Sequence, residues 1–299
     1  MAGDGMGAAA ERARLDYDFN LRERCPNYGR DFAFWESESA VFRRAWPASQ
    51  CDLAYGPHSL ERYDLFLPSG DAGPVPFCLY LHPGSWQRLD KSLFSMIAPP
   101  LLDRGIAVAA VNYPLVPEVT IGGIVGRVRA CLAEMRRDAD RLGLDPDRIG
   151  MIGHSAGGHL AAMIHARASE LDPGLRRAIR VVASVGGFYD LEPVRRSFMN
   201  MALGLDPETA RDLSPISGED RLDCPFVLVV GERETGEFRD QQRRMAEVLR
   251  RQGADPLELI LPGQDHFSLV AELASRPNPV MTAVADALLA GVNSSGPGL

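Results

Sequence analysis

Short apolar runs alternate with longer amphipathic stretches over most of this chain. Six runs are too short for helices and mostly lack polar alternation, which is typical of strands covered on both faces in a parallel sheet. Stretches between them, such as 120–142 and 236–252, carry apolar residues at helical spacing. This alternation predicts a doubly wound α/β fold. The runs are FCLYL (77–81), IAVAAV (106–111), IGMI (149–152), VVASV (181–185), FVLVV (226–230) and LELIL (257–261).

Two segments before the first run add to this organisation. Residues 62–67, RYDLFL, alternate polar with apolar side chains and predict an antiparallel strand near the edge of the sheet. Residues 15–50 are dense in aromatic side chains. We expect this segment to pack over the carboxyl edge of the sheet as a cap and to help wall a pocket.

The chain has 299 residues, of which 45% are hydrophobic, as in an ordinary globular protein with a substantial core. No Pro-, Gly- or Ser-rich linker interrupts residues 50–290. We therefore predict a single domain over 15–292, with disordered tails at 1–14 and 293–299.

The charge balance argues against nucleic acids and membranes as partners. The formal net charge is −8, and the arginines are scattered rather than clustered. Five widely spaced cysteines without a C-x-x-C pair predict neither disulfides nor a zinc site. No apolar segment approaches the ~18 residues of a membrane span, and the first residues do not resemble a secretory leader. We expect a cytoplasmic protein.

The stretch GHSAG (153–157) is the first candidate for chemistry. It follows a buried run and opens a helix over 156–167, the context of a nucleophile elbow with Ser155 at its tip. Small residues flank the serine because bulky side chains would collide across so sharp a turn. The alternative is that Ser155 only caps the helix.

The other members of a triad should follow in the order acid, then histidine. His266 is the only histidine beyond residue 165 and lies in a loop after a predicted strand. After FVLVV the chain offers Glu232, Glu234 and Glu237, and Glu234 is the one we expect near the carboxyl edge of the sheet.

LHPGSW (81–86) follows an early strand, where an HGGG-type loop would supply oxyanion donors. Proline lacks an N–H, so position 83 cannot donate, and the expected donors are Gly84, Ser85 and Ala156. His82 and Trp86 are candidate substrate-binding residues, with packing as the alternative for Trp86.

The stretch HPGSWQRLDKS (82–92) resembles the HGG-aromatic-Trp-x-x-x-Asp-Lys-Ser stretch of kynurenine formamidases (arylformamidases), within the α/β-hydrolase superfamily. The resemblance spans about residues 60–275 and implies the α/β-hydrolase fold, with Ser155 as nucleophile and His266 as base. Glu234 takes the place of the family's usual aspartate. Pro83 and Ser85 replace a glycine and a usually aromatic residue, which concerns the fit of the substrate. Further matches are NYPLVPEVTI (112–121), GHSAGGHLAAM (153–163), GFYDLEPV (187–194), LSPIS (213–217), GERETGEFRDQ (231–241) and LPGQDHFSLV (261–270).

Together these features predict a serine hydrolase that transfers the acyl group of a small-molecule amide or ester to water, without a metal or organic cofactor. The resemblance implies formate as the acid released. One alternative is a carboxylesterase for another ester. Another is a non-catalytic binding protein on the same scaffold, which an intact set of Ser, Glu and His disfavours. Helices near 268–292 could support a homodimer, but packing on the sheet explains them as well.

Overall fold

The computed structural model describes residues 2–70 and 73–290. Their strands form one eight-stranded sheet. The strand order is β1-β2-β4-β3-β5-β6-β7-β8; β2 runs antiparallel to both of its neighbours, β1 and β4, and all other neighbouring pairs are parallel. The six apolar runs all form strands, and 62–67 forms an antiparallel strand next to the edge, as predicted. The strands are β1 Ser49–Ala54, β2 Arg62–Phe66, β3 Val75–Leu81, β4 Ala107–Val111, β5 Leu144–His154, β6 Ile179–Val185, β7 Phe226–Gly231 and β8 Leu257–Leu261.

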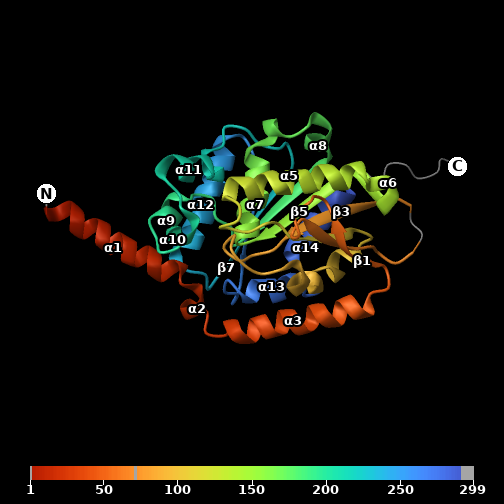
Figure 1. Ribbon diagram of the computed structural model, residues 1–299, viewed down its shortest axis with the longest axis horizontal. Helices are drawn as coiled ribbons and strands as arrows, with labels where there is room; N and C mark the ends of the chain where they lie inside the picture. The colour runs from red at the N-terminus through yellow and green to blue at the C-terminus, as the bar shows by residue number, and fades with distance from the viewer. Residues whose placement is uncertain (1, 71–72, 291–299) are drawn as a thin grey trace.

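Helices cover both faces of this sheet, which confirms the doubly wound prediction (Figure 1). The α-helices are α1 Ala2–Phe19, α2 Leu21–Arg24, α3 Tyr28–Ala45, α4 Pro99–Leu102, α5 Ile121–Arg137, α6 Ala139–Leu142, α7 Ala156–Ala166, α8 Pro173–Ala178, α9 Glu192–Arg195, α10 Asn200–Leu203, α11 Pro207–Asp212, α12 Gly236–Arg251, α13 Ser268–Leu273 and α14 Pro279–Leu289. Three 3₁₀ segments are η1 Lys91–Ile97, η2 Ala168–Glu170 and η3 Pro215–Ser217.

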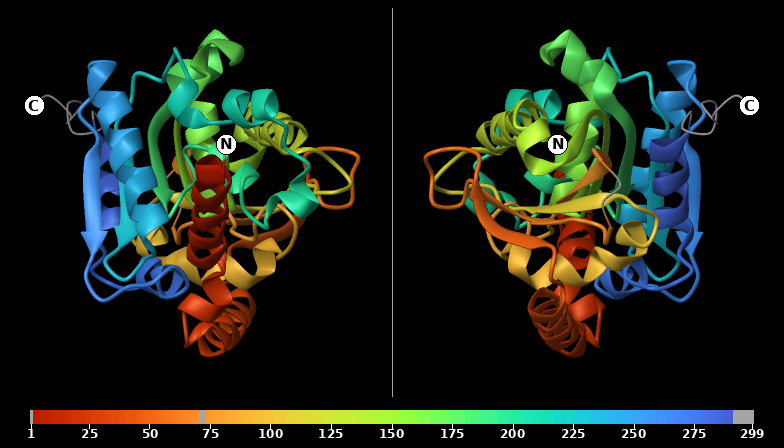
Figure 2. Two further views of the ribbon diagram at one scale, coloured as in Figure 1. Left: turned by 90° about the vertical axis from the view of Figure 1, so that its left-hand side faces the viewer. Right: turned by 90° about the vertical axis from the view of Figure 1, so that its right-hand side faces the viewer.

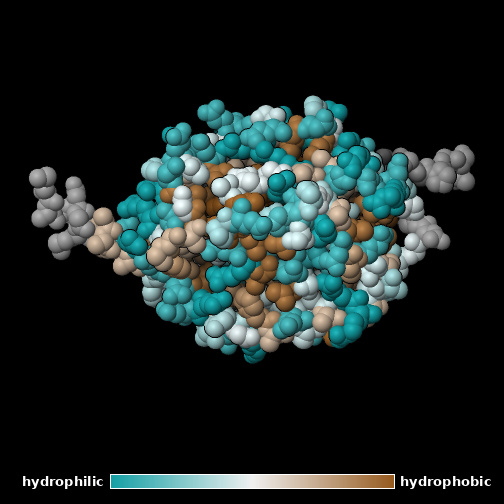
Figure 3. Space-filling model, viewed as in Figure 1, coloured by the Kyte–Doolittle hydropathy of each residue, from teal (hydrophilic) through white to brown (hydrophobic). Residues whose placement is uncertain are grey.

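Two apolar cores result, one on each face of the sheet. Residues of α5, α7 and α12 pack with one set of strand side chains, while α3, η1, α13 and α14 supply the other. Side chains alternate between the faces along a strand: in β3, Phe77 belongs to the first core and Cys78 to the second. Figure 2 shows α3 at the outside of the molecule, and Figure 1 shows α1 extending away from the body. The surface in Figure 3 is mostly hydrophilic, with apolar patches near the middle of that face.

Strand β8 departs from the prediction that its run is covered on both faces. It is the last strand of the sheet, and Leu257 and Ile260 are 45% and 63% exposed. An apolar run alone does not distinguish a central strand from an edge strand, because the order of strands is decided by tertiary packing.

The prediction of a disordered tail at 1–14 is wrong, because these residues belong to α1 from Ala2 onward. The run AAAERAR (8–14) consists of strong helix formers, and Arg14 at its end binds Glu237 of α12 at 3.1 Å. The other predicted tail, 293–299, lies outside the described residues.

Candidate active site

Ser155 lies at the turn where β5 ends and α7 begins. Its φ of 55° and ψ of −117° are strained values for a residue with a side chain. A Cβ atom at Gly153 would lie 2.0 Å from the carbonyl oxygen of Gly157, and one at Gly157 would lie 2.0 Å from that of Leu81. Both positions therefore require glycine. The Ser155 hydroxyl makes no capping hydrogen bond to α7, so the structure does not support a plain helix cap.

His266 and Glu234 form a buried pair from the loops after β8 and β7. Nδ1 of His266 is 2.9 Å from Oε2 of Glu234. An imidazole whose Nδ1–H donates to a carboxylate keeps Nε2 free to accept a proton, as a general base requires. The competing glutamates have other partners: Glu232 accepts from the N–H of Gly263, and Glu237 binds arginines. The structure thus joins the predicted acid and base.

Two further aromatic rings hold His266 in place. The ring centroids of Phe238 and His154 lie 4.6 and 4.8 Å from that of His266. Burial, followed by the nearby His266, lowers the pKa of His154 well below its ordinary value, so this ring stays neutral. Sequence reasoning gave no role to either residue; the position of His154 directly before Ser155 is the one signal that pointed to it.

The loop after β3 provides candidate oxyanion donors. Gly84 and Ser85 have positive φ values of 131° and 54°, and both line the same cavity as Ser155. Among the described residues, their backbone N–H groups donate to no carbonyl or side-chain acceptor. Ala156 begins α7, where an N–H has no partner within the helix. Three predicted donors are therefore free beside Ser155, where they can stabilise a developing negative charge.

His82 and Trp86 do not take the substrate-binding positions predicted for them. Both are almost completely buried and lie outside the lining of the cavity. The His82 ring stacks on Tyr113, with centroids 4.4 Å apart, and Trp86 donates its indole N–H to Nδ1 of His159 at 3.3 Å. The buried ring of Trp86 packs on Phe188, which supports the alternative that Trp86 is a packing residue.

A cavity of about 250 Å³ lies above Ser155 and His266. The segment before β1 forms much of its wall, and the rest comes from the oxyanion loop, Phe198 and the loop of His266. The aromatic density of 15–50 pointed to Phe32 and Trp35, but no sequence signal identified Arg22, Arg88 or Phe198. The lining residues are Phe19, Asn20, Leu21, Arg22, Phe32, Trp35, Pro83, Gly84, Ser85, Arg88, Leu89, Ser155, Phe198, His266 and Phe267.

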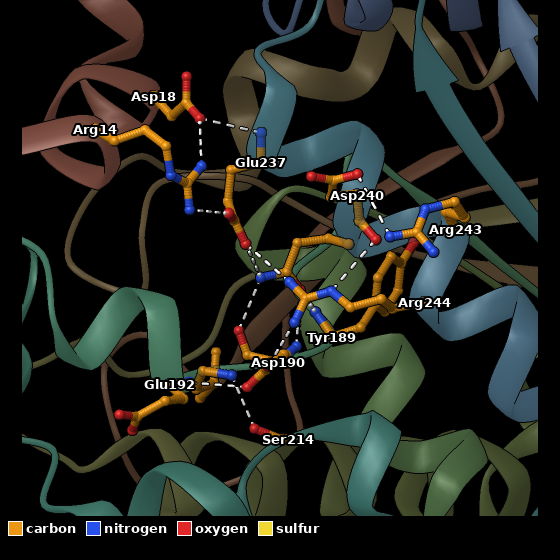
Figure 4. A network of polar contacts seen from close by, with 12 residues as sticks. Arg14, Asp18, Tyr189, Asp190, Glu192, Ser214, Glu237, Asp240, Arg243 and Arg244 are labelled. Carbon is orange, nitrogen blue, oxygen red and sulfur yellow. Dashed lines mark hydrogen bonds and ion pairs between the residues drawn. The ribbon is translucent and has the colours of Figure 1, made fainter. Parts of the chain in front are cut away.

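A network of polar contacts fastens α1 beside this cavity (Figure 4). Glu237 is buried, and its two carboxylate oxygens accept from Arg14 of α1 and Arg244 of α12 at 3.1 and 2.9 Å. Asp18 of α1 accepts from the backbone N–H of Glu237 at 3.2 Å. At the end of α1, the ring of Phe19 packs on that of Phe238, 5.9 Å between centroids, and thus contacts the ring that supports His266.

Over residues 2–70 and 73–290, no group of three or more His, Cys, Asp or Glu side chains is placed to hold a metal ion. None of the helices in these two ranges is long and apolar enough to span a membrane.

Comparison with known proteins finds relatives that are hydrolases. The BD-FAE family model matches residues 63–247. Kynurenine formamidase of Danio rerio is 29% identical over 230 residues, 74% of this chain and 76% of that protein. Esterase LipC of Mycobacterium tuberculosis is 27% identical over 71% of this chain and 57% of its own. The crystal structure of a putative thioesterase from Silicibacter sp. superposes with a TM-score of 0.83 at 28% identity, covering 90% and 98% of the two chains.

These relatives agree with the α/β fold and with acyl transfer by the residues around Ser155. The family match covers more than half of the chain, from β2 to α12. Kynurenine formamidases and esterases are both hydrolases of amide or ester bonds. The chain belongs to the BD-FAE family and is an arylformamidase-like hydrolase of the α/β-hydrolase superfamily.

Proposed function

We propose that the protein is a serine hydrolase that removes a small acyl group, formyl above all, from an aryl amide. The observation that carries this proposal is the buried contact of 2.9 Å between Nδ1 of His266 and Oε2 of Glu234. His266 lines the same cavity as Ser155. The similarity to kynurenine formamidases supports the formyl group and the aryl amide.

The proposed reaction has two acyl-transfer steps. His266 removes the proton from Ser155 as the serine Oγ attacks the carbonyl carbon of the substrate. Glu234 orients the imidazole and stabilises its charged form. The N–H groups of Gly84, Ser85 and Ala156 bind the oxyanion. The imidazolium then protonates the leaving amine. Water, deprotonated by His266, attacks the acyl-enzyme and releases the acid and the serine.

The test measures formate release from N-formylkynurenine together with labelling by a fluorophosphonate probe. Ser155→Ala should abolish both, while Ser37→Ala, at an exposed serine of α3, should leave both at the wild-type level. Labelling that persists in Ser155→Ala contradicts the assignment of the nucleophile. Labelling of the wild type without formate release contradicts only the formyl amide.

A carboxylesterase is the second candidate. Esterases and methylesterases occur among the relatives, and Ser85 stands where the formamidase motif usually has an aromatic residue. The same nucleophile would serve both reactions. Comparison of kcat/KM for N-formylkynurenine and for short p-nitrophenyl esters separates the two candidates, since an esterase turns over only the esters efficiently.

We further propose that residues 15–50 act as a cap, because Phe32 and Trp35 contribute to the cavity wall. Deletion of the segment should impair bulky substrates more than small ones. A homodimer and a cytoplasmic location stay predictions, to be tested by light scattering and by cell fractionation.

A further inference from the structure

Two arginine side chains line the cavity from different parts of the chain. Arg22 belongs to α2 in the segment before β1, and Arg88 belongs to the loop that carries Gly84 and Ser85. Both are exposed to solvent, and neither forms an ion pair or hydrogen bond with a carboxylate of the described residues. The contact found for Arg22 is the ring of Tyr28, 5.9 Å from its guanidinium.

These two cations have no counter-charge inside the cavity. Its lining contains no aspartate or glutamate. The pKa of Arg88 is lowered by partial burial and then by the nearby positive charge of Arg22. In a chain with a formal net charge of −8, a positive mouth of this kind attracts anions and raises their local concentration.

The position of Arg88 is tied to the catalytic loop. A Cβ atom at Gly84 would lie 2.0 Å from the backbone carbonyl oxygen of Arg88, so the two ends of this turn are in close contact. The N–H of Gln87 also donates to the carbonyl of Gly84 at 3.0 Å. The backbone that presents Arg88 is thus fixed relative to the oxyanion donors.

We propose that Arg22 and Arg88 bind a carboxylate on the substrate, so that this hydrolase prefers amides or esters that carry a net negative charge. Guanidinium groups match a carboxylate in geometry and form charge-assisted hydrogen bonds with it. Arg22, Arg88 and Ser155 line the same cavity of about 250 Å³, so a substrate bound there has both the arginines and the nucleophile on its walls. Since no aspartate or glutamate lines the cavity, the two arginines are not neutralised there, and the carboxylate of a substrate supplies the missing charge.

This inference rests on the proposed function, and its test uses matched substrates that differ in one charge. The first pair is 3-acetoxybenzoate and 3-acetoxybenzamide, with the charge on the leaving group. The second is p-nitrophenyl hydrogen glutarate and the p-nitrophenyl ester of glutaramic acid, with the charge on the acyl group. The measured quantity is the ratio of kcat/KM for the carboxylate to kcat/KM for its carboxamide, which cancels changes common to both.

In at least one pair, Arg22→Gln and Arg88→Gln should each lower this ratio about tenfold, as expected for the loss of one charge-assisted hydrogen bond. Arg24→Gln is the matched control: Arg24 lies on the same short helix, but over the ring of Tyr17 at 4.0 Å and outside the cavity lining. Its ratio should equal that of the wild type. The preference of the wild type should also weaken with added salt.

A second readout is independent of turnover. Calorimetric titration of Ser155→Ala should show tighter binding of 3-acetoxybenzoate than of 3-acetoxybenzamide, and the added substitution Arg88→Gln should remove the difference. Hydrolysis of both members with ratios that neither arginine substitution changes overturns the inference and leaves the hydrolase intact. Selective binding of the carboxylate without turnover or probe labelling overturns the proposed function and retains the anion site.

Discussion

The substitution Gly157→Ala tests whether the elbow and the oxyanion loop are held together by backbone contact. Gly157 lies in the first turn of α7, two residues after Ser155. The added Cβ would lie 2.0 Å from the carbonyl oxygen of Leu81 and 2.8 Å from that of His82, whereas real Cβ contacts stay above 3.0 Å. The start of α7 and the end of β3 would therefore have to separate by about 1 Å, the least displacement that removes an overlap of this size.

This displacement should cost both stability and activity. Leu81 and the surrounding strand are fully buried, so the separation acts as overpacking of a core and should lower the free energy of unfolding by about 1–3 kcal/mol. The loop with Gly84 and Ser85 follows Leu81 directly, so its donors move relative to Ser155. A misplacement of about 1 Å can reduce the rate roughly hundredfold. Urea unfolding and kcat/KM for p-nitrophenyl acetate measure the two effects.

The matched control is Gly126→Ala in α5. A Cβ at this exposed helical position meets nothing within 4 Å. Activity should stay at the wild-type value, and the free energy of unfolding should rise by about 0.5–1 kcal/mol, because alanine loses less entropy than glycine in a helix. Wild-type kcat/KM in Gly157→Ala would refute the claim that close backbone contact positions the oxyanion donors.

Three further predictions address the acid, the buried histidines and the N-terminal helix. Glu234→Gln should lower kcat by a factor of about 10²–10⁴ by disturbing the imidazole tautomer, whereas Glu232→Gln should leave it unchanged; equal losses would contradict the assignment of the acid. Burial lowers the folded-state pKa of His82 and of His159 to about 4 from 6.5, so between these values the unfolded chain binds protons that the folded chain does not. The free energy of unfolding should therefore fall as the pH drops from 7 to 5, by about 2 kcal/mol per histidine, and urea unfolding that is constant over this range would argue against buried neutral rings. Arg14→Ala should loosen α1 from α12 and speed proteolysis within α1, with Arg12→Ala, whose partner is the neighbouring Asp16, as the control that should not.

The parts of the fold and site that sequence predicted are those set by local backbone geometry. The elbow at Ser155 needs glycine on both sides, and such a requirement leaves a readable spacing. Apolar runs marked the buried strands in the same way. The run of β8 was misjudged, since exposure of Ile260 depends on which strand lies beside it. The sequence could not decide between substrate binding and packing for Trp86, and it placed His82 at the substrate, because a polar or aromatic side chain after a strand looks the same whether it turns inward or outward.

The substrate side of the cavity depends on long-range packing, and this limits what similarity can predict. The family match spans 63–247, yet the cavity wall includes Arg22, Phe32 and Trp35, which precede it, and His266, which follows it. Gly84, Gly153 and Gly157, whose close backbone contacts shape the oxyanion loop and the elbow, lie within the match. Relatives that share this part can therefore share acyl transfer and still differ in substrate. The two arginines proposed to select the substrate, Arg22 and Arg88, lie far apart in the sequence, and only folding brings them to one cavity. The preference for an anionic substrate therefore follows from the structure and not from the sequence.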